Sequence, residues 1–235
     1  MKFNNARIAE NAIIDLHVHS RGSWDGFSTV QENIMVAKSR GYSVIGCVEH
    51  DSFPELSQPL NFFDGVCVLA GVELSVYPFH VLAFGKINDR LGLLAKVSKL
   101  SNIEVLEYLS DSGYYSVLAH PFRLKEILRS RGFRLINEMV SKAFFVEAVN
   151  GRSFVSNLFA QFKVPREKSV AGSDSHHMYE IGNAYTVADS LDVSSIDSLF
   201  HSLKKASKKN IHNPNLYSLF YSRYLKFKER RKKIW

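Results

Sequence analysis

Short apolar runs alternate with amphipathic stretches along most of the chain. Apolar runs that predict strands are AIIDLHVH, VIGCVEH, VCVLAGVEL, FHVLAFG, YYSVLAHP, FFVEAVN and KSVAGSD. Between them, helical spacing of apolar residues is found over 29–40, 91–112, 124–142 and 153–163, and the first of these stretches is followed by Gly41. Repeated strand and helix units of this kind predict an α/β fold, and specifically a (β/α) barrel.

The pattern changes after Val187. Residues 197–205 could form a short helix, and Asn213-Pro214-Asn215 predicts a turn. Apolar side chains then recur at helical spacing with cations between them, at Leu216, Leu219, Phe220, Tyr224 and Phe227. We therefore expect a body over residues 1–190 and a helical extension over 191–235. The apolar stripe of the extension is expected to dock on the barrel, although it could instead bind a membrane or a partner.

Length and composition suit one large α/β domain or one domain with an appendage. A chain of 235 residues with 46% hydrophobic residues can bury a sizeable core. It has no run of 18 or more apolar residues, so no membrane span is expected, and its first residues lack a secretory pattern. Cys47 and Cys67 lie in apolar runs and are expected to be buried thiols rather than a disulfide framework, as suits the cytoplasm.

The net charge of +7 is concentrated near the end of the chain. From Lys204 onward there are 11 basic residues and one acidic residue, whereas the rest of the chain carries 19 basic and 22 acidic residues. The body is thus mildly acidic, and the extension is basic and rich in aromatic residues. Such an extension could bind a polyanion such as a nucleic acid.

Histidines and carboxylates follow consecutive apolar runs, where strands would leave a barrel core. They are His17, His19, His50, Glu73, His120, Asp174 and His176. Alternate residues on a strand point the same way, so both imidazoles of His17-x-His19 can reach one metal ion. Asp174-x-His176 repeats the spacing at a late strand end. Imidazoles and carboxylates collected at one rim predict a divalent metal centre.

The ordered motifs DLHVHS with a following DG, EHDS, GVELS, HVLAFG, AHPFR and GSDSH resemble the PHP (polymerase and histidinol phosphatase) family of metal-dependent phosphoesterases. The resemblance covers residues 12 to about 187. It implies a distorted (β/α)7 barrel of PHP type that holds two or three divalent metal ions, and here the barrel would be followed by the basic helical extension. Mixed histidine and carboxylate sites suit Mn, Zn or Fe.

The same resemblance implies a set of metal ligands. His17, His19, Glu73 and Asp174 would surround one metal, and Glu73 would bridge to a second metal held with His120 and His80. Asp25, His50 and His176 match the ligands of a third metal. The loop HSRGSWDG has one more residue before Asp25 than the common form of the motif, and His80 lies inside a predicted strand.

The expected activity is hydrolysis of a phosphate ester by a metal-activated water, without a serine or cysteine nucleophile. The residues expected to carry it are His17, His19, Glu73, His120, Asp174 and His176. Arg123 and Arg152 follow strand ends on the same rim and could clamp phosphate oxygens. Asp15 is expected to orient a ligand histidine rather than touch metal, and Glu147 is expected either to support a ligand in the same way or to be a salt-bridge partner.

Three functions remain open from the sequence. The first is a nuclease-like hydrolase of nucleotides or nucleic-acid ends, which the basic, aromatic-rich extension favours. The second is a phosphatase for a small molecule such as histidinol phosphate or a sugar phosphate. The third is a non-catalytic scaffold that uses the extension to recruit a nucleic-acid partner. A protein partner or a second copy of the chain could complete the assembly.

Overall fold

The computed structural model describes residues 8–85 and 90–232, and Lys233 of the predicted basic extension lies outside them. The strands are β1 (Ile8–Val18), β2 (Val44–His50), β3 (Leu60–Phe63), β4 (Val66–Val76), β5 (Phe79–Phe84), β6 (Tyr115–Ala119), β7 (Phe145–Asn150), β8 (Ser169–Gly172), β9 (Ala184–Asp192) and β10 (Lys208–His212). The helices are α1 (Val30–Ser39), α2 (Arg90–Val97), α3 (Asn102–Asp111), α4 (Leu124–Arg129), α5 (Phe133–Lys142), α6 (Val155–Lys163), α7 (Ile196–Lys205) and α8 (Leu216–Lys232), with 3-10 turns η1 (Arg166–Lys168) and η2 (Met178–Glu180).

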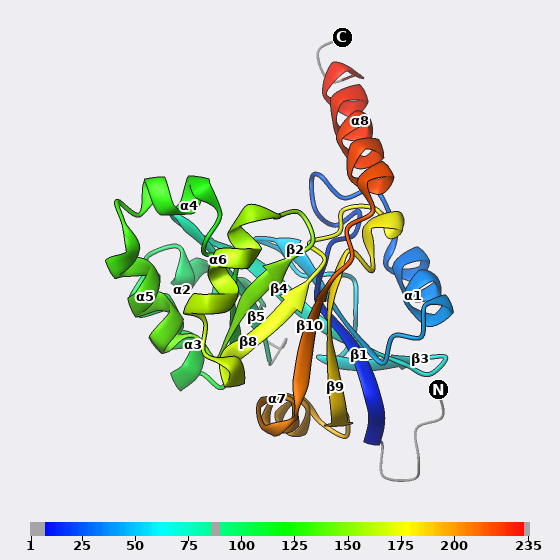
Figure 1. The fold of residues 1–235 in the computed structure, drawn as a ribbon, viewed down its shortest axis with the longest axis horizontal. Coiled ribbons are helices and arrows are strands. Elements are labelled where there is room, and N and C mark those ends of the chain that lie inside the picture. Colours follow the sequence, from blue (N-terminus) through cyan, green and yellow to red (C-terminus); the bar gives the residue numbers. More distant parts are fainter. Residues whose placement is uncertain (1–7, 86–89, 233–235) are drawn as a thin grey trace.

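The strands form one curved sheet in the order β10-β9-β1-β2-β4-β5-β6-β7-β8, with β3 beside β4 (Figure 1). β1, β2 and β4 run parallel, as do β6, β7 and β8, whereas β5 is antiparallel to both of its neighbours. Beyond β8, the carbonyl oxygen of Ser175 accepts a hydrogen bond from the His19 N–H at 2.8 Å, which joins the chain after β8 to the end of β1. The predicted distorted barrel is thereby confirmed as a nearly closed one.

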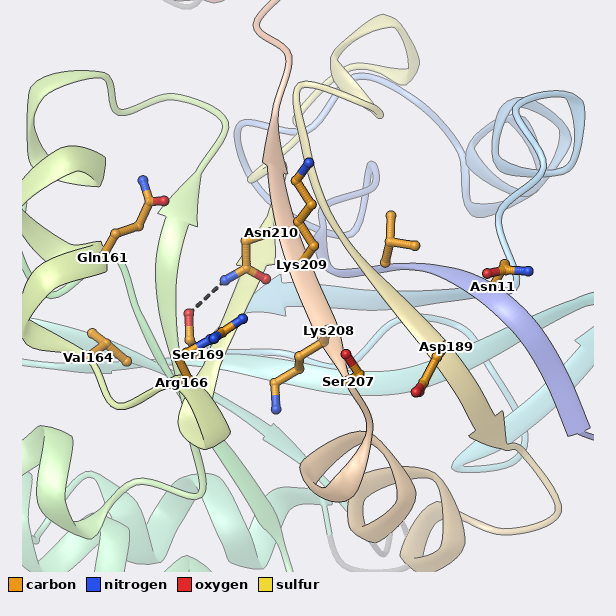
Figure 2. A pocket seen from close by; sticks show the side chains of 11 residues that line it. Asn11, Gln161, Val164, Arg166, Ser169, Asp189, Ser207, Lys208, Lys209 and Asn210 are labelled. Carbon is orange, nitrogen blue, oxygen red and sulfur yellow. Dashed lines mark hydrogen bonds between the residues drawn. The ribbon is translucent and has the colours of Figure 1, made fainter.

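Side chains also join β8 to β9 and β10 near the start of β8 (Figure 2). Asn210 donates to Ser169 Oγ at 2.6 Å and accepts from Thr186 Oγ1 at 2.9 Å. Thr186 Oγ1 in turn accepts from the backbone N–H of Ala171 at 2.8 Å. β8 lies at one edge of the sheet, and β9 and β10 lie at the other. These bonds therefore hold the two edges of the sheet together, at the end of the barrel opposite the predicted metal ligands.

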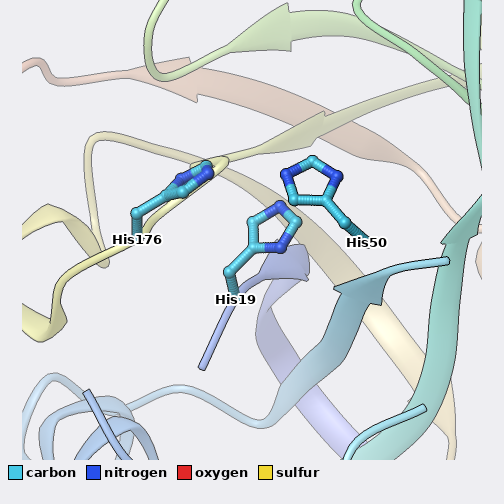
Figure 3. A group of neighbouring side chains, drawn as sticks. All are labelled: His19, His50 and His176. Carbon is cyan, nitrogen blue, oxygen red and sulfur yellow. The ribbon is translucent and has the colours of Figure 1, made fainter. Parts of the chain in front are cut away.

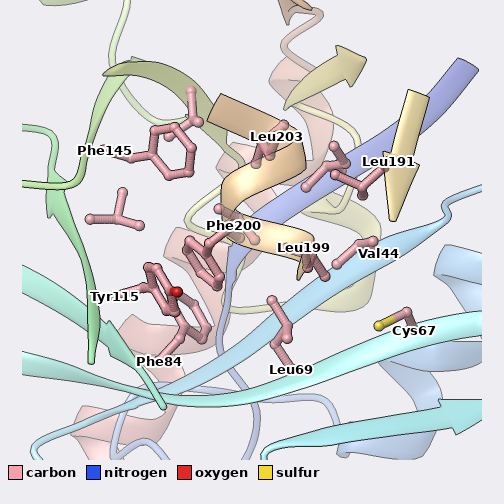
Figure 4. Close-up of a cluster of buried hydrophobic side chains, with 14 of the residues drawn as sticks. Val44, Cys67, Leu69, Phe84, Tyr115, Phe145, Leu191, Leu199, Phe200 and Leu203 are labelled. Atoms are coloured by element: carbon pink, nitrogen blue, oxygen red, sulfur yellow. The ribbon is translucent and has the colours of Figure 1, made fainter. Parts of the chain in front are cut away.

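The barrel interior is apolar at this opposite end (Figure 4). α7 inserts Leu199, Phe200 and Leu203 among the strands, and all three are fully buried. The Phe200 ring stacks on Tyr115 with centroids 4.4 Å apart, and Phe84 and Phe145 pack around it. This plug fills one end of the barrel, so the buried histidines and carboxylates gather at the other end.

Helices cover the outside of the sheet, and two of the predicted helical stretches are each divided in two. The stretch 91–112 forms α2 and α3, because Ser101 and Glu104 make a capping box that begins a new helix. The stretch 124–142 forms α4 and α5, with Gly132 between them at φ +124°. Among the described residues, every helix is too short or too polar to cross a lipid bilayer.

The boundary expected at residue 190 falls inside β9, which ends at Asp192. β10 then pairs antiparallel with β9, and α7 belongs to the barrel core. Residues 191–212 are therefore continuous with the barrel. Figure 1 shows α8 standing away from it, above the carboxyl ends of the strands.

α8 meets the barrel through serines rather than through its apolar stripe. Ser218 and Ser222 are buried, and Ser222 Oγ accepts from the Arg152 guanidinium at 2.8 Å. The more than half-exposed side chains of the stripe are Leu216 (57%), Phe220 (66%), Tyr224 (57%) and Phe227 (57%). The expectation that this stripe docks on the barrel is wrong, because small hydroxyl side chains form the contact and leave the larger apolar ones outside.

Candidate metal centre

The structure brings every predicted ligand into one buried cluster at the carboxyl ends of the strands. β1 supplies His17 and leads into His19, β2 ends at His50, and Glu73 and His80 lie on β4 and β5. His120 follows β6, Asp174 and His176 follow β8, and Asp25 comes from the loop between β1 and α1. His50 and His80 are partly exposed, while the other members are buried.

The first group of donor atoms surrounds a single point. His17 Nε2 and His19 Nε2 face each other at 3.1 Å. Glu73 Oε2 lies 3.5 Å from the former and 3.2 Å from the latter. Asp174 Oδ1 lies 3.8 Å from both nitrogens. These are the four residues that the resemblance assigned to one metal.

Glu73 connects this group to a second one through its other oxygen. Glu73 Oε1 lies 3.1 Å from His80 Nδ1 and 3.6 Å from His120 Nε2. The second oxygen of Asp174 lies 4.0 Å from His120 Nε2. A carboxylate with one oxygen in each group is suited to bridge two cations.

A third group is formed by His19, His50 and His176, whose rings converge in Figure 3. Asp25 joins it, because its Oδ2 lies 2.9 Å from His176 Nε2 and its Oδ1 lies 3.4 Å from His50 Nε2. The extra residue of the loop is accommodated by turns in which Ser23 N–H donates to the carbonyl of Ser20 and Gly26 N–H to that of Ser23. The longer loop therefore still delivers Asp25 to the cluster.

Two members of the cluster adopt backbone conformations that L-residues rarely occupy. His120 has φ +33° and Asp174 has φ +53°. A left-handed conformation costs about 1–2 kcal/mol for a residue with a Cβ atom. Such strain is concentrated at functional sites, where it aims a side chain that the regular strand would direct elsewhere.

Carboxylates behind the cluster orient its members. Glu147 Oε1 lies 3.1 Å from His17 Nδ1, which directs Nε2 toward the donor group, and Glu147 Oε2 accepts from the His120 N–H at 3.1 Å. Asp15 Oδ1 accepts from the N–H groups of His17 and Ser173 at 3.1 and 3.0 Å. The orienting roles expected for Asp15 and Glu147 agree with these contacts.

Sequence reasoning missed two further buried carboxylates. Glu126 Oε1 lies 3.6 Å from His120 Nδ1, on the side of the ring opposite the donor group. Glu49 accepts from Ser23 Oγ at 2.6 Å, and that hydroxyl lies 3.0 Å from His19 Nδ1. Glu49 stands beside His50 in the motif EHDS, which was a usable signal, whereas the sequence around Glu126 carries none.

Two carboxylates of the cluster, those of Glu73 and Asp174, are held ionised. Burial raises the pKa of Glu73, but His17 and its neighbouring imidazoles outweigh this effect and keep the pKa well below its usual range. Burial likewise raises the pKa of Asp174, and Arg123 together with His17 more than reverses it. Ionised oxygens in a buried site attract cations.

The pKa values of His17 and His176 are shifted in opposite directions. Burial lowers the pKa of His17, but Glu147 and Glu73 outweigh it and hold the pKa well above its usual value, so His17 sits in a strongly negative environment. Burial and the neighbouring His19 lower the pKa of His176 to about 3, so this imidazole is neutral at physiological pH. A neutral imidazole offers a nitrogen lone pair to a metal.

The donor set fits divalent metal ions. Among the described residues, the buried atoms Glu73 Oε2 and His80 Nδ1 make no hydrogen bond of good geometry, although other donor atoms of the cluster lie close to them. Buried polar atoms normally have a partner. A cation between the facing nitrogens and oxygens would satisfy them all, and mixed imidazole and carboxylate ligands suit Zn, Mn and Fe.

Both predicted phosphate clamps lie at the edge of the cluster. Arg123 forms an ion pair with Asp174 through Nη2, which also donates to Asn150 at 2.6 Å. Arg152 lies 2.9 Å from His176 Nδ1 and donates to Glu180 at 3.0 Å. Each arginine therefore has protein partners for its guanidinium, while about one-fifth of its side chain is exposed to solvent.

Sequence reasoning also missed Trp24, which stands over the third group. Its ring is 70% exposed and stacks on His50 with centroids 5.9 Å apart. A large aromatic side chain held in solvent beside a metal centre is a surface on which a substrate could pack. Trp24 immediately precedes Asp25 in the lengthened loop.

Comparison with known proteins places the chain among phosphoesterase relatives. Residues 168–207 match the family model described as "PHP-associated". A "Probable phosphatase" of Shewanella halifaxensis is 22% identical over 211 residues, which cover 76% of this chain and 83% of that protein. The "Probable phosphatase YcdX" of Escherichia coli K12 is 24% identical over 200 residues, covering 72% and 80%.

Solved structures share the fold at low identity. PsfC from Pseudomonas syringae aligns with a TM-score of 0.66 at 15% identity, covering 92% of this chain and all of that one. The lesion-specific endonuclease PfuEndoQ of Pyrococcus furiosus aligns with a TM-score of 0.62 at 15% identity, covering 85% and 57%. A Bacteroides vulgatus protein that contains a predicted PHP-like metal-dependent phosphoesterase gives 0.59 at 13%, covering 91% and 69%.

The resemblance to the PHP family is confirmed. Its evidence is the PHP-associated match together with the relatives named phosphatase, and the fold is shared with the protein that contains a predicted PHP-like phosphoesterase. The barrel also explains why the ligands converge, because the strand ends that carry them meet at one rim.

Proposed function

We propose that this PHP protein is a metal-dependent phosphoesterase that acts on nucleotides or on the ends of nucleic acids. The observation that carries the proposal is the set of three adjoining donor groups that share Glu73 and His19. A phosphoric ester hydrolase is supported by the relatives named phosphatase. Nucleotides as substrates are a finer proposal, supported by the surroundings of the cluster.

The chain's own residues have distinct parts in this proposal. His17, His19, Glu73 and Asp174 would hold one cation, Glu73 with His80 and His120 a second, and Asp25 with His50 and His176 a third. When bound, such cations neutralise phosphoryl oxygens and lower the pKa of the attacking water. Arg123 and Arg152 would position the remaining phosphate oxygens. His50, whose pKa is raised because Asp25 and Glu73 outweigh the effect of burial, would pass a proton to the leaving group if the third position is empty.

Charge and aromatic side chains beside the cluster favour a nucleotide. Arg123, Arg152 and Arg223 line one cavity together with Phe154 and Phe220. α8 is rich in basic residues along its sequence. Cations that follow a phosphate backbone and aromatic rings that stack on bases are the usual means of binding single-stranded nucleic acid.

Two other functions are alternatives to this proposal. A small-molecule phosphatase is favoured by the names of the relatives, and α8 would then merely serve solubility or assembly. A scaffold without activity is disfavoured, because the described residues retain the whole set of donors that the resemblance implies. We further propose Mn, Zn or Fe as the metal and a cytoplasmic location, and a protein partner or a second copy of the chain remains a proposal.

A substrate panel tests the proposed function. Protein loaded with Mn²⁺ or with Zn²⁺ would be assayed on 4-nitrophenyl phosphate, bis(4-nitrophenyl) phosphate, sugar phosphates and 5′-labelled single-stranded DNA and RNA. We expect metal-dependent turnover that is fastest on nucleotides or labelled ends. Turnover confined to sugar phosphates would select the phosphatase, and bound metal without turnover on any substrate would select the scaffold.

A further inference from the structure

The cavity beside the metal centre is built from three separate parts of the fold. Arg123 precedes α4, Arg152 and Phe154 come from the loop between β7 and α6, and Phe220 lies on α8. Its volume is about 560 Å³, within the range of roughly 300–1,000 Å³ that is typical of small-molecule sites. α8 therefore forms one wall of a pocket rather than a detached extension.

The pocket is continuous with the metal centre through its arginines. The guanidinium of Arg123 touches Asp174, and that of Arg152 lies 2.9 Å from His176. A phosphate held at the cluster would thus have its ester substituent at the mouth of the pocket. The far wall adds a third guanidinium, from Arg223 on α8.

The remaining lining is flat or apolar. Phe154 is 45% exposed and Phe220 is 66% exposed, so each presents much of its ring outside the core. Leu216 and Leu219 complete the wall on α8. Apart from guanidinium donors, the side chains that line this pocket have no hydrogen-bonding group, so they offer no acceptor to the hydroxyls of a sugar. They do offer ring faces and guanidinium planes to a planar aromatic group.

We propose that this pocket binds the nucleobase of a nucleotide whose phosphate lies at the metal centre, with Phe154 and Phe220 as the stacking residues. The inference rests on the proposed function and deepens it, because it makes α8 the element that selects nucleotides over other phosphate esters. The exposure of Phe220 in the apolar stripe of α8 then has a reason, because its ring faces the ligand instead of the barrel.

Arg152, which lines the pocket, also helps to hold α8 in position. Arg152 donates to Ser222 on α8, and Asn183 receives the N–H of Asn215 at 2.9 Å just before the helix begins. Asn183 also donates to Ser218 at 3.4 Å. These bonds fix the rotation of α8 about its axis and hence the side on which Phe220 lies.

Binding of adenosine 5′-monophosphate and of ribose 5-phosphate tests the proposal, since the two differ by the base. Their dissociation constants would be measured by isothermal titration calorimetry on Mn²⁺-loaded protein. Stacking on an aromatic side chain is worth about 5- to 150-fold in affinity. The quantity compared is the ratio of the dissociation constant of ribose 5-phosphate to that of adenosine 5′-monophosphate. We expect this ratio to be at least about ten in the wild type, and Phe220→Leu or Phe154→Leu to reduce it at least about fivefold.

Phe227→Leu is the matched control, because Phe227 lies two turns farther along α8 and is 57% exposed, close to the exposure of Phe220. It should leave the ratio unchanged. The proposal would be overturned by a wild-type ratio near one, or by a ratio that is unchanged in both pocket variants. Failure of both ligands to bind would also overturn it. Absence of turnover on every phosphoester, with the ratio and its loss as expected, would instead refute the proposed hydrolysis and leave the pocket standing.

Discussion

Glu147→Gln tests whether Glu147 orients two of the candidate metal ligands, His17 and His120. The carboxylate of Glu147 receives three groups: Oε1 lies 3.1 Å from His17 Nδ1, and Oε2 accepts from the His120 N–H at 3.1 Å and from Asn150 Nδ2 at 2.8 Å. Glutamine has nearly the same size, but one of its two terminal atoms is an NH₂ donor. Whichever way the amide is turned, that donor faces N–H groups on one side.

Either orientation disturbs a candidate ligand. If the NH₂ group faces His17, the ring must either turn, so that Nε2 no longer points at Glu73, or change its tautomer, so that Nε2 carries the proton and offers no lone pair to a metal. If it faces His120 N–H and Asn150, the strained turn at His120 loses its anchor. Loss of a residue that orients a metal ligand typically weakens metal binding about 10- to 100-fold, or about 1.4–2.7 kcal/mol.

The assay is calorimetric titration of metal-depleted protein with Mn²⁺ and with Zn²⁺, supported by circular dichroism to verify the fold. Glu138→Gln is the control, because Glu138 is an exposed carboxylate on α5, away from the cluster. We expect Glu147→Gln to weaken binding about 10- to 100-fold and Glu138→Gln to leave it unchanged. Equal affinities in the wild type and in a folded Glu147→Gln protein would refute the argument that Glu147 orients His17 and His120.

Three further outcomes follow from the site and its surroundings. His17→Ala or Asp174→Asn should lower kcat at least about 100-fold while thermal unfolding still shows a folded protein; near wild-type rates in metal-replete buffer would remove these residues from the mechanism. Chelation with EDTA should lower Tm by about 5–10 °C, since a metal present at 100 times its Kd adds about 2.7 kcal/mol, and a Tm insensitive to metal would contradict a resident cation. Gly172→Ala should cost about 1–3 kcal/mol in urea unfolding, because a Cβ would collide with Glu147 and would lie 2.7 Å from His17 Cβ; an unchanged midpoint would show that the site yields easily.

Much of the fold could be predicted because strand ends and ligands coincide in the sequence. The apolar run before His17 ends where β1 leaves the core, and the run before His120 ends where β6 does. The sheet-edge strand β10 was missed, because its residues 208–212 are mostly polar and lack an apolar alternation. It is held by backbone pairing with β9, which no local pattern reveals.

The side chains through which α8 contacts the barrel could not be predicted from its sequence. An apolar stripe at helical spacing usually marks the buried face of a helix. Here the contact is made by Ser218 and Ser222, whose hydroxyls meet Asn183 and Arg152, residues that are remote in sequence. Glu126 was missed for the same reason, since its meaning lies in its proximity to His120.

The central claim is that residues from separate strands hold at least two cations around Glu73. The most direct measurement is elemental analysis of the purified protein combined with anomalous diffraction from crystals grown with Mn²⁺ or Zn²⁺. We expect two or more metal peaks, with Glu73 bridging the first two and Asp174 coordinating one of them, at ligand distances of about 2.0–2.3 Å. Crystals in which metal is absent from this cluster, or is bound elsewhere while Glu73 and Asp174 remain uncoordinated, would contradict the account.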